Sequence, residues 1–431
     1  MFNRIVRFLT LSLFVCFNLT LPFCSAVKKD FSRPGISSSN SRLKSFKNEY
    51  RPVCSNTGLK ALKSGVARKI YRGLLEKNLK IEAEKSKKGE TFYPIEPIPI
   101  PYCDSGNIPD YDEFLHEARC ALNAFLNDYP ECFWVAKRYF IQSFEDGILI
   151  TFYSDLSPVE VKKLRDDLER KISQIITQIP ADFDPYKSEL WIYNYLAENA
   201  EYNHSKKFPP TDFNVYGCLV LKTCVCEGFS KAFKLLCNRV GIETETICGI
   251  SFGELHMWNL VKISEDWYHV DVTWASGVKS YMRRHDWFNV TNSIISKDHE
   301  WKLNKNSFRE YGDLRYILEF NQVLQPEKCV ELKKNFYQVE GLKFSESDKF
   351  CEVFHEKLID AAKTKEKYLH ILLDSRRESK SKFTKWAKAN VKKLLSSVNG
   401  YNKSKNKFKL KEPQFSYSSN QDVISLEFEY F

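Results

Sequence analysis

The clearest pattern of apolar and polar positions lies near the middle of the chain. From Glu227 onward, apolar residues recur at intervals of three and four residues, which is the spacing of one helical face. Gly241 follows, in the position where glycine commonly ends a helix. The pattern predicts a buried helix with Cys226 at its N-terminus. The apolar residues of this face are Phe229, Phe233, Leu236 and Val240.

Two segments with alternating polarity follow the helix. Residues 255–261 and 267–274 are rich in aromatic and β-branched residues, and the polar Ser264-Glu265-Asp266 lies between them. This combination predicts a β-hairpin.

The alternation of this hairpin also predicts its register. A turn centred on Ser264-Glu265 pairs His256 with Thr273 and places Asp271 diagonally adjacent on the same face. A slip of one residue would put His256 and Asp271 on opposite faces. The opposite face is then apolar and suited to a core.

The rest of the chain alternates between helical and strand patterns. Amphipathic helical spacing covers residues 59–83, and the prolines of residues 94–101 predict an extended, polyproline-like spacer. The other predicted helices cover residues 111–126, 158–179, 184–200, 347–362 and 379–398, and the other predicted strands cover residues 148–153, 370–373 and 422–431.

These elements predict an α+β protein with a central core and α/β extensions on both sides. We expect a signal peptide at residues 1–26, a basic leader with the amphipathic helix and the Pro-rich spacer at 27–105, an N-terminal α/β subdomain at 106–185, a catalytic core at 186–310, and a C-terminal basic α/β domain at 311–431.

The N-terminus has the pattern of a secretory signal. Arg4 and Arg7 precede a mostly apolar run at residues 8–23, and Cys24-Ser25-Ala26 provides small residues for cleavage. A membrane anchor is the alternative, but the run is short and diluted by polar residues, whereas a span needs about 20 apolar residues. We expect cleavage after Ala26 and a secreted or extracytoplasmic protein.

Composition narrows the classes of partner. The 65 lysines and arginines exceed the 55 acidic residues by ten, but no basic stripe with interleaved aromatics suggests nucleic acid. The lysine-dense residues 357–411 predict a solvated surface, with contact to an anionic cell surface as the alternative. Of 13 cysteines, two leave with the signal peptide, and one catalytic thiol among the other eleven leaves ten for disulfides.

The residue types at the centre suggest nucleophilic catalysis. A cysteine at a helix N-terminus gains from the helix dipole as a thiolate, and the free backbone N–H groups there can hold an oxyanion. His256 would take the thiol proton, and Asp271 would fix the tautomer of the imidazole. Cys224, two residues before Cys226, is the alternative nucleophile or a disulfide partner.

Three segments together resemble the core of the transglutaminase-like superfamily. They are residues 216–244 (YGCLVLKTCVCEGFSKAFKLLCNRVGIET), residues 255–274 (LHMWNLVKISEDWYHVDVTW), and WFNV with Asp298-His299. The resemblance is firm over about residues 186–299. It implies a papain-like core in which Cys226, His256 and Asp271 are the catalytic residues, and it implies no cofactor.

The sequence departs from animal transglutaminases next to the cysteine. Val225 and Glu227 flank Cys226 where those enzymes have a Gln-Cys-Trp type of motif. A second oxyanion donor would then come from Tyr216 or Tyr202. No carboxylate cluster resembles a calcium loop.

Other residues near the motifs receive less specific predictions. His269 shares the face of Asp271 and is a rival base, although packing or substrate contact is the favoured role, and Trp258 is a core or cleft wall that could contact substrate. No metal site is expected, because Cys224-Val225-Cys226 lacks the spacing of zinc ligands. Three further histidines are expected to be structural: His204, His285 and His299.

The function predicted from these features is a secreted thiol enzyme that cleaves peptide or amide bonds through a thioester. Its partner would be a protein or peptide substrate, and no signal for an oligomeric state is present. One alternative is a transglutaminase that joins glutamine to an amine. The other is a non-catalytic module whose flanking domains bind a surface.

Overall fold

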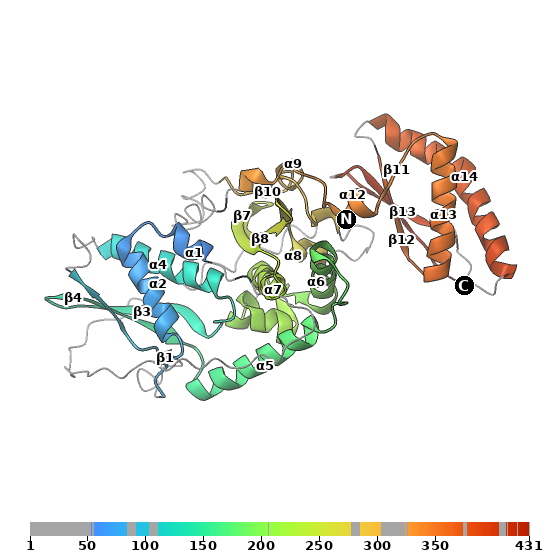
Figure 1. Ribbon diagram of the computed structural model, residues 1–431. Helices are drawn as coiled ribbons and strands as arrows, with labels where there is room; N and C mark the ends of the chain where they lie inside the picture. The colour runs from blue at the N-terminus through green and yellow to red at the C-terminus, as the bar shows by residue number, and fades with distance from the viewer. Residues whose placement is uncertain are drawn as a thin grey trace.

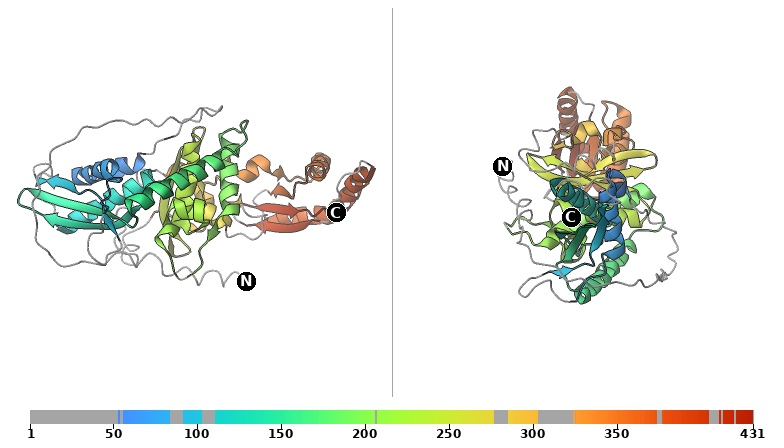
Figure 2. Two further views of the ribbon diagram at one scale, coloured as in Figure 1. Left: turned by 90° about the horizontal axis from the view of Figure 1, so that it is seen from below. Right: turned by 90° about the vertical axis from the view of Figure 1, so that its left-hand side faces the viewer.

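The computed structural model describes residues 53, 56–83, 92–102, 111–205, 207–276, 285–302, 324, 326–373, 377–404, 411, 413–419 and 421–430. Within them, three units of mixed helix and sheet lie in a row along the chain (Figures 1 and 2). The predicted signal peptide and the leader up to residue 52 lie outside the described residues. Among the described helices, none combines the length and the apolar character that crossing a bilayer requires.

The N-terminal unit packs helices against an antiparallel sheet. Strand β4 lies in the middle of the sheet and pairs with β1, β2 and β3. A buried apolar cluster joins the sheet to the helices, with Ile70, Phe125 and Ile150 fully buried. The elements are α1 (Thr57–Ala61), α2 (Gly65–Lys77), β1 (Tyr93–Pro94), β2 (Ile98–Pro101), α4 (Tyr111–Asp128), β3 (Val135–Ser143) and β4 (Gly147–Ser154).

Two predictions for this unit are wrong. The helix predicted over residues 59–83 is divided, because the Ser64 side chain accepts a hydrogen bond from the N–H of Ala67 and starts α2, which ends at Lys77. The Pro-rich segment is extended but is no spacer. Ile98 and Ile100 of β2 are buried against β4, while Pro99 is exposed on this edge strand.

The central unit begins with two long helices whose N-termini are capped as their sequences suggest. Ser157 and Glu160 form a reciprocal capping box at the start of α5 (Pro158–Ile176). Asp184 accepts from the N–H of Lys187 at the start of α6 (Pro185–Asn199), where proline occupies the first turn. Both helices end before the C-termini predicted for them.

A buried helix and a four-stranded antiparallel sheet form the core of this unit. The strand order is β10-β7-β8-β9, and α7 packs on one face of the sheet. A second cluster, which contains Ile247, Leu260 and Trp301, covers the other face. The elements are β5 (Glu201–Tyr202), a π-helical turn (Gly217–Leu221), β6 (Thr223–Cys224), α7 (Cys226–Arg239), β7 (Thr244–Ser251), β8 (Glu254–Ile263), β9 (Asp266–Val270), α8 (Val272–Ser276), α9 (Asn292–Ile295) and β10 (His299–Glu300).

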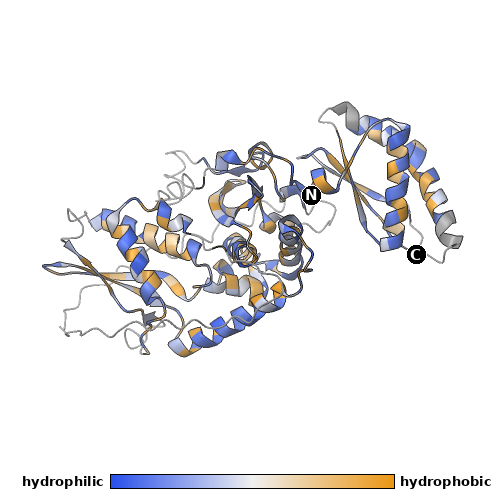
Figure 3. Cartoon of the chain, viewed as in Figure 1, coloured by the Kyte–Doolittle hydropathy of each residue, from blue (hydrophilic) through white to orange (hydrophobic). Residues whose placement is uncertain are grey.

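The C-terminal unit places two helices over a sheet of order β11-β12-β14-β13. Ser347 caps α13 by accepting from the N–H of Phe350. Colouring by hydropathy shows apolar and polar residues alternating along both helices (Figure 3). The elements are α12 (Phe336–Glu340), β11 (Leu342–Lys343), α13 (Asp348–Thr364), β12 (Tyr368–Leu372), α14 (Arg377–Ser404), β13 (Gln414–Ser418) and β14 (Val423–Glu427).

Polar contacts join the central unit to both neighbours. On one side, Thr57 donates to Glu245 and Lys137 pairs with Glu227. On the other side, Tyr337 donates to Asp286 at 2.8 Å. The ten disulfide cysteines expected from the composition find no counterpart in the described part of the chain, because all nine cysteines described there are free.

Candidate active site

The N-terminus of α7 holds the candidate nucleophile. Cys226 is the first residue of the helix, as predicted, and the cap residue Val225 has no side chain that can satisfy the free N–H groups of the first turn. Gly228 lets this turn lie close to its neighbours, since a Cβ there would lie 2.6 Å from the carbonyl oxygen of Asp212. The helix start is therefore fixed by packing and keeps N–H donors for an oxyanion.

The structure separates the two neighbouring cysteines. Cys226 is partly exposed, whereas Cys224 is fully buried. Burial, followed by the hydrogen bond and the charge of Cys218, raises the pKa of Cys224 well above its usual value. Because a buried neutral thiol is a poor nucleophile, the alternative that placed the nucleophile at Cys224 is not supported.

The predicted hairpin has the predicted register. Ile263 pairs with Asp266 across the two-residue turn, and Val261 pairs with Tyr268. The strand β9 ends at Val270, however, so the predicted pair of His256 with Thr273 does not form. Asp271 lies in the junction between β9 and α8, on the side of the sheet that carries His256.

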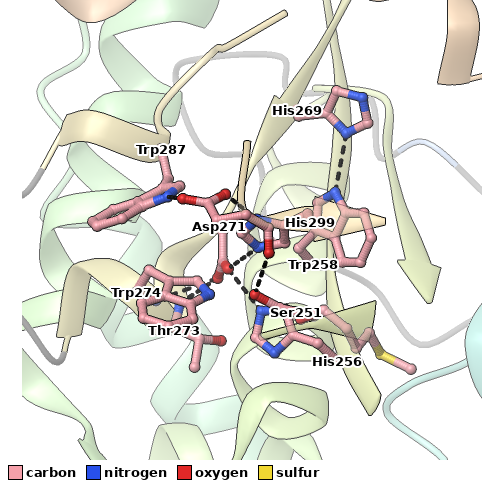
Figure 4. A network of polar contacts seen from close by, with 12 residues as sticks. Ser251, His256, Trp258, His269, Asp271, Thr273, Trp274, Trp287 and His299 are labelled. Carbon is pink, nitrogen blue, oxygen red and sulfur yellow. Dashed lines mark hydrogen bonds and ion pairs between the residues drawn. The ribbon is translucent and has the colours of Figure 1, made fainter. Parts of the chain in front are cut away.

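Asp271 is fully buried and accepts four hydrogen bonds (Figure 4). Its Oδ2 accepts from Nε2 of His256 at 2.7 Å and from Nε2 of His299 at 2.9 Å. Its Oδ1 accepts from the N–H groups of Thr273 at 2.8 Å and Trp274 at 3.4 Å. Burial alone would raise the pKa of Asp271, but the charges and hydrogen bonds of the two histidines hold it below its usual range.

These contacts assign the tautomer of His256. A carboxylate can only accept, so Nε2 of His256 carries the proton that is shared with Asp271. Nδ1 is then the nitrogen that is left for the thiol of Cys226, with which His256 also forms a side-chain hydrogen bond. Burial lowers the pKa of His256, but Asp271 and then Cys226 outweigh it and raise the pKa to about 10. An imidazolium beside the sulfur is therefore favoured at neutral pH.

A charged cluster lies next to the cysteine on the same helix. Glu227 is buried and pairs with Lys231 at 2.7 Å and with Lys137, from the N-terminal unit, at 2.9 Å. Burial would raise the pKa of Glu227, but the charges of Lys137 and Lys231 bring it down to about 2. Two lysines therefore pair with one carboxylate in the first turns of α7, beside Cys226 in the sequence.

Two of the predicted substrate contacts are buried instead. Trp258 is fully buried, stacks on His256 at 6.0 Å between ring centroids, and donates from its indole N–H to Nδ1 of His269 at 3.0 Å. His269 is also fully buried and donates from Nε2 to Asn292. Burial, above all, lowers the pKa of His269 to about 3. Trp258 therefore supports the ring of His256, and His269 is neither a base nor a substrate contact.

The two tyrosines proposed as oxyanion donors occupy different places. Tyr202 is half-buried, and burial, followed by the charges of Cys226 and Glu254, raises its pKa. It therefore lies within electrostatic reach of the thiol. Tyr216 packs its ring on Phe133 at 5.2 Å, and none of its contacts within the described residues involves the triad. Of the two, only Tyr202 stays a candidate.

The role expected of His299 from the sequence was structural, and this prediction is wrong. The structure places it in the network, because His299 on β10 contacts the same oxygen of Asp271 as His256 does. Its adjacent Asp298 was the only signal available, since Asp298-His299 forms part of the family resemblance. Of the other two histidines, His285 stacks on Phe336, and His204 packs against Tyr202 with the two rings tilted at 45°.

The same network contains the group of side chains in the described chain that could hold a metal ion. His256, Asp271 and His299 offer ligand atoms within 4.8 Å of one another. These atoms already share protons in hydrogen bonds, and a metal there would displace the Nε2 proton that joins His256 to Asp271. The geometry is that of a proton-sharing network.

Aromatic side chains border the exposed side of His256. Trp274 lies 6.2 Å from His256 and 5.1 Å from Phe252, measured between ring centroids. Phe252 is 55% exposed and has a positive φ of 50° in the turn between β7 and β8. A bulky residue with positive φ is uncommon, so the turn holds an exposed aromatic ring beside the site at some cost in backbone strain.

Comparison with known proteins finds similarity over part of the chain. Residues 174–272 match the model of the transglutaminase-like superfamily. The kyphoscoliosis peptidases of Mus musculus and Homo sapiens are each 23% identical to this chain, over 184 and 183 residues. The matches cover 36% and 35% of this chain and 27% of each relative, so the chain spans about a quarter of the length of these relatives.

Two solved structures are also similar over part of the chain. One is a candidate cysteine protease from Cytophaga hutchinsonii, which is 15% identical and covers 32% of this chain and 61% of its own, with a TM-score of 0.22. The other is a TGase, which is 13% identical and covers 42% of this chain and 54% of its own, with a TM-score of 0.25.

Proposed function

Since residues 174–272 belong to the transglutaminase-like superfamily, we propose that this protein is a thiol-dependent acyl-transfer enzyme that cleaves peptide or amide bonds. One observation carries the proposal. His256 donates a hydrogen bond from Nε2 to the buried Asp271 and leaves Nδ1 for Cys226, which stands at the start of α7. This is the arrangement that a thiolate nucleophile requires.

The proposed reaction starts from a thiolate and an imidazolium. The sulfur of Cys226 attacks the carbonyl carbon of an amide, and the oxygen takes up negative charge near the N–H groups of the first turn of α7. His256 then gives its Nδ1 proton to the nitrogen of the leaving amine as the C–N bond breaks. Water, deprotonated by His256, attacks the resulting thioester and releases the acid and the free thiol.

Hydrolysis is favoured over transamidation by the kind of relatives matched. The curated relatives are named peptidases, and Val225 and Glu227 flank the cysteine in place of the residues of animal transglutaminases. A transglutaminase that resolves the thioester with an amine is the second candidate. The substrate in either case would be a protein or a peptide.

The proposal also includes export of the protein and contact of its C-terminal unit with an anionic surface. The signal-like N-terminus supports export with cleavage after Ala26. The lysine-rich C-terminal unit supports contact with an anionic surface, and α14 carries Lys380, Lys385 and Lys388 along it.

Labelling with a thiol-reactive probe tests the proposal. We expect the native protein to be labelled at Cys226 and the Cys226→Ala variant to lose that label. An unlabelled Cys226 in the reduced, folded protein would leave only a binding role. Incubation with a glutamine peptide and a tagged amine then separates the two enzyme classes, because incorporation of the amine would remove the peptidase assignment.

A further inference from the structure

His299 makes contacts that no part of the proposed reaction uses. It lies on the short strand β10 and is fully buried. Its Nε2 lies 2.9 Å from Oδ2 of Asp271, and its Nδ1 lies 2.6 Å from Oδ1 of Asp298. Both ring nitrogens therefore face carboxylate oxygens (Figure 4).

This geometry determines the proton count of the ring. A carboxylate has no proton to donate, and a neutral imidazole has only one N–H. Two hydrogen bonds to two carboxylates therefore need an imidazolium, which carries one positive charge between Asp271 and Asp298. A buried positive charge is tolerated here because both of its N–H groups are paired with negative charge.

The charged and titratable groups around His299 come from several segments. Asp271 follows β9, Asp298 precedes β10, and His256 lies on β8 with its ring centroid 5.2 Å from that of His299. His269, on β9, is neutral and close enough for the charge of His299 to lower its pKa further. Asp298 is itself fixed, because its Oδ2 accepts from the indole N–H of Trp287 at 3.2 Å.

The fold makes specific room for this histidine. Strand β10 pairs with β7 so that His299 lies opposite Ser251, whose hydroxyl donates to the backbone oxygen of Asp298 at 2.8 Å. Gly249 allows the approach, since a Cβ there would lie 2.2 Å from the carbonyl oxygen of Glu300 and 2.7 Å from the ring of Trp258. A side chain at position 249 would displace β10.

We propose that His299 is a positioning residue that fixes Asp271 and, as a cation, stabilises the thiolate–imidazolium pair of Cys226 and His256. This inference rests on the proposed function. With two donors on each oxygen, the carboxylate of Asp271 has one orientation, and the ring of His256 is aligned with it. The positive charge of His299 also offsets the negative charge of Asp271. A second negative charge, on the sulfur of Cys226, is then more easily formed.

The test measures the sulfur directly and needs no substrate. Alkylation of Cys226 by iodoacetamide is followed by mass spectrometry as a function of pH in the full-length protein, because only the thiolate reacts. The midpoint of the acid limb then reports how readily the thiolate forms. The proteins compared are the wild type, His256→Ala, His299→Ala, His299→Gln and His370→Ala.

The expected order of midpoints follows from the contacts. In His299→Ala the midpoint rises by about one pH unit, which is about tenfold less thiolate at a fixed lower pH. In His299→Gln it rises less, because the amide N–H of glutamine can still donate to Asp271. A midpoint that stays at the wild-type value in His299→Ala overturns the inference while the proposed function stands.

Two comparisons keep the test decisive. His370 is also buried and bonded to Ser425 at 2.7 Å, so His370→Ala is expected to lower the melting temperature without moving the midpoint. A shift in this control as large as that in His299→Ala would assign the effect to destabilisation and overturn the inference. Equal alkylation of the wild type and His256→Ala at all pH values would overturn the proposed function itself. If His299→Ala does not fold, the midpoint of His299→Gln decides.

Discussion

Two buried carboxylates in the central unit have opposite environments. Asp271 and Glu189 are both fully buried. Asp271 accepts four hydrogen bonds, two of them from histidines. Glu189 accepts one, from the amide of Asn289 at 2.9 Å, and its Oε1 has no hydrogen-bond partner within the described residues.

Their protonation differs accordingly. The pKa of Asp271 is lowered by the charges and hydrogen bonds of His256 and His299, which overcome its burial. The pKa of Glu189 is raised to about 8 by burial, which the single bond from Asn289 only partly offsets. Burial alone therefore does not decide whether a carboxylate is charged. The number and charge of its donors decide, and they distinguish the carboxylate that orients His256 from a structural one.

Replacing each carboxylate by its amide gives the largest expected difference between them. Asp271→Asn should reduce acyl transfer by roughly a thousandfold, because an amide no longer holds His256 in the required tautomer. Glu189→Gln should leave the rate within a few-fold of wild type, because its side chain does not contact the triad. Initial rates on one peptide substrate would compare the two. Equal losses would mean that the contrast in donors has no bearing on function.

Although Glu189→Gln should hardly affect the rate, it should change how the stability of the folded protein depends on pH. The folded-state pKa of Glu189 is raised from its usual 4.5 to about 8, so the folded protein holds a proton that the unfolded chain releases. Its contribution to stability is complete below about pH 4.5 and is lost as the pH rises through 8. At about 1.4 kcal/mol per unit, the loss is a few kcal/mol.

Glu189→Gln, which cannot ionise, should flatten this part of the pH dependence. Urea unfolding of the wild type and the variant between about pH 5 and about pH 9 would measure it. If both proteins lose stability equally over this range, Glu189 is not the group responsible.

A smaller effect on the reactivity of Cys226 is expected from Trp287, which is linked to Asp271 only through Asp298 and His299. Trp287→Phe removes the indole N–H that bonds Asp298 at 3.2 Å and should cost about 1 kcal/mol. Alkylation of Cys226 should slow by less than tenfold, because Asp271 keeps its own four donors. Trp191→Phe is the matched control, since Trp191 stacks on Tyr195. A loss with Trp287→Phe as large as that with Asp271→Asn would show that the network acts as a single unit.

The smallest effect concerns a third buried carboxylate, Glu227, which is kept charged by lysines. Lys137 is about one-third exposed, so Lys137→Met should cost no more than about 1 kcal/mol in the free energy of unfolding, and less at high salt. Thermal unfolding at low and high ionic strength would measure this. A cost above about 3 kcal/mol would instead indicate that the pair behaves as a fully buried one.

Local patterns in the sequence predicted much of the candidate site. The helical spacing from Glu227 to Val240 located the start of α7 at Cys226, and the alternation around Ser264-Glu265 gave the register of β8 with β9. In both cases the periodicity of one element, or of two adjacent ones, decides where the side chains point.

The sequence did not predict contacts that depend on distant segments. His299 lies 28 residues beyond Asp271, on a strand of two residues that is too short to show periodicity. The Pro-rich strand β2 did carry a signal, because Ile98 and Ile100 alternate with prolines. An edge strand tolerates those prolines, but only the position of β4 shows that an edge is available there.

The position of Asp271 at the junction of β9 and α8 links the site to local opening of the backbone. Its Oδ1 holds the N–H groups of the first turn of α8, as a helix cap does, while its Oδ2 holds the histidines. Any fluctuation that frays this turn also releases the carboxylate. Amide hydrogen exchange at Thr273 and Trp274 would therefore report, residue by residue and without a substrate, how much of the time the site is assembled.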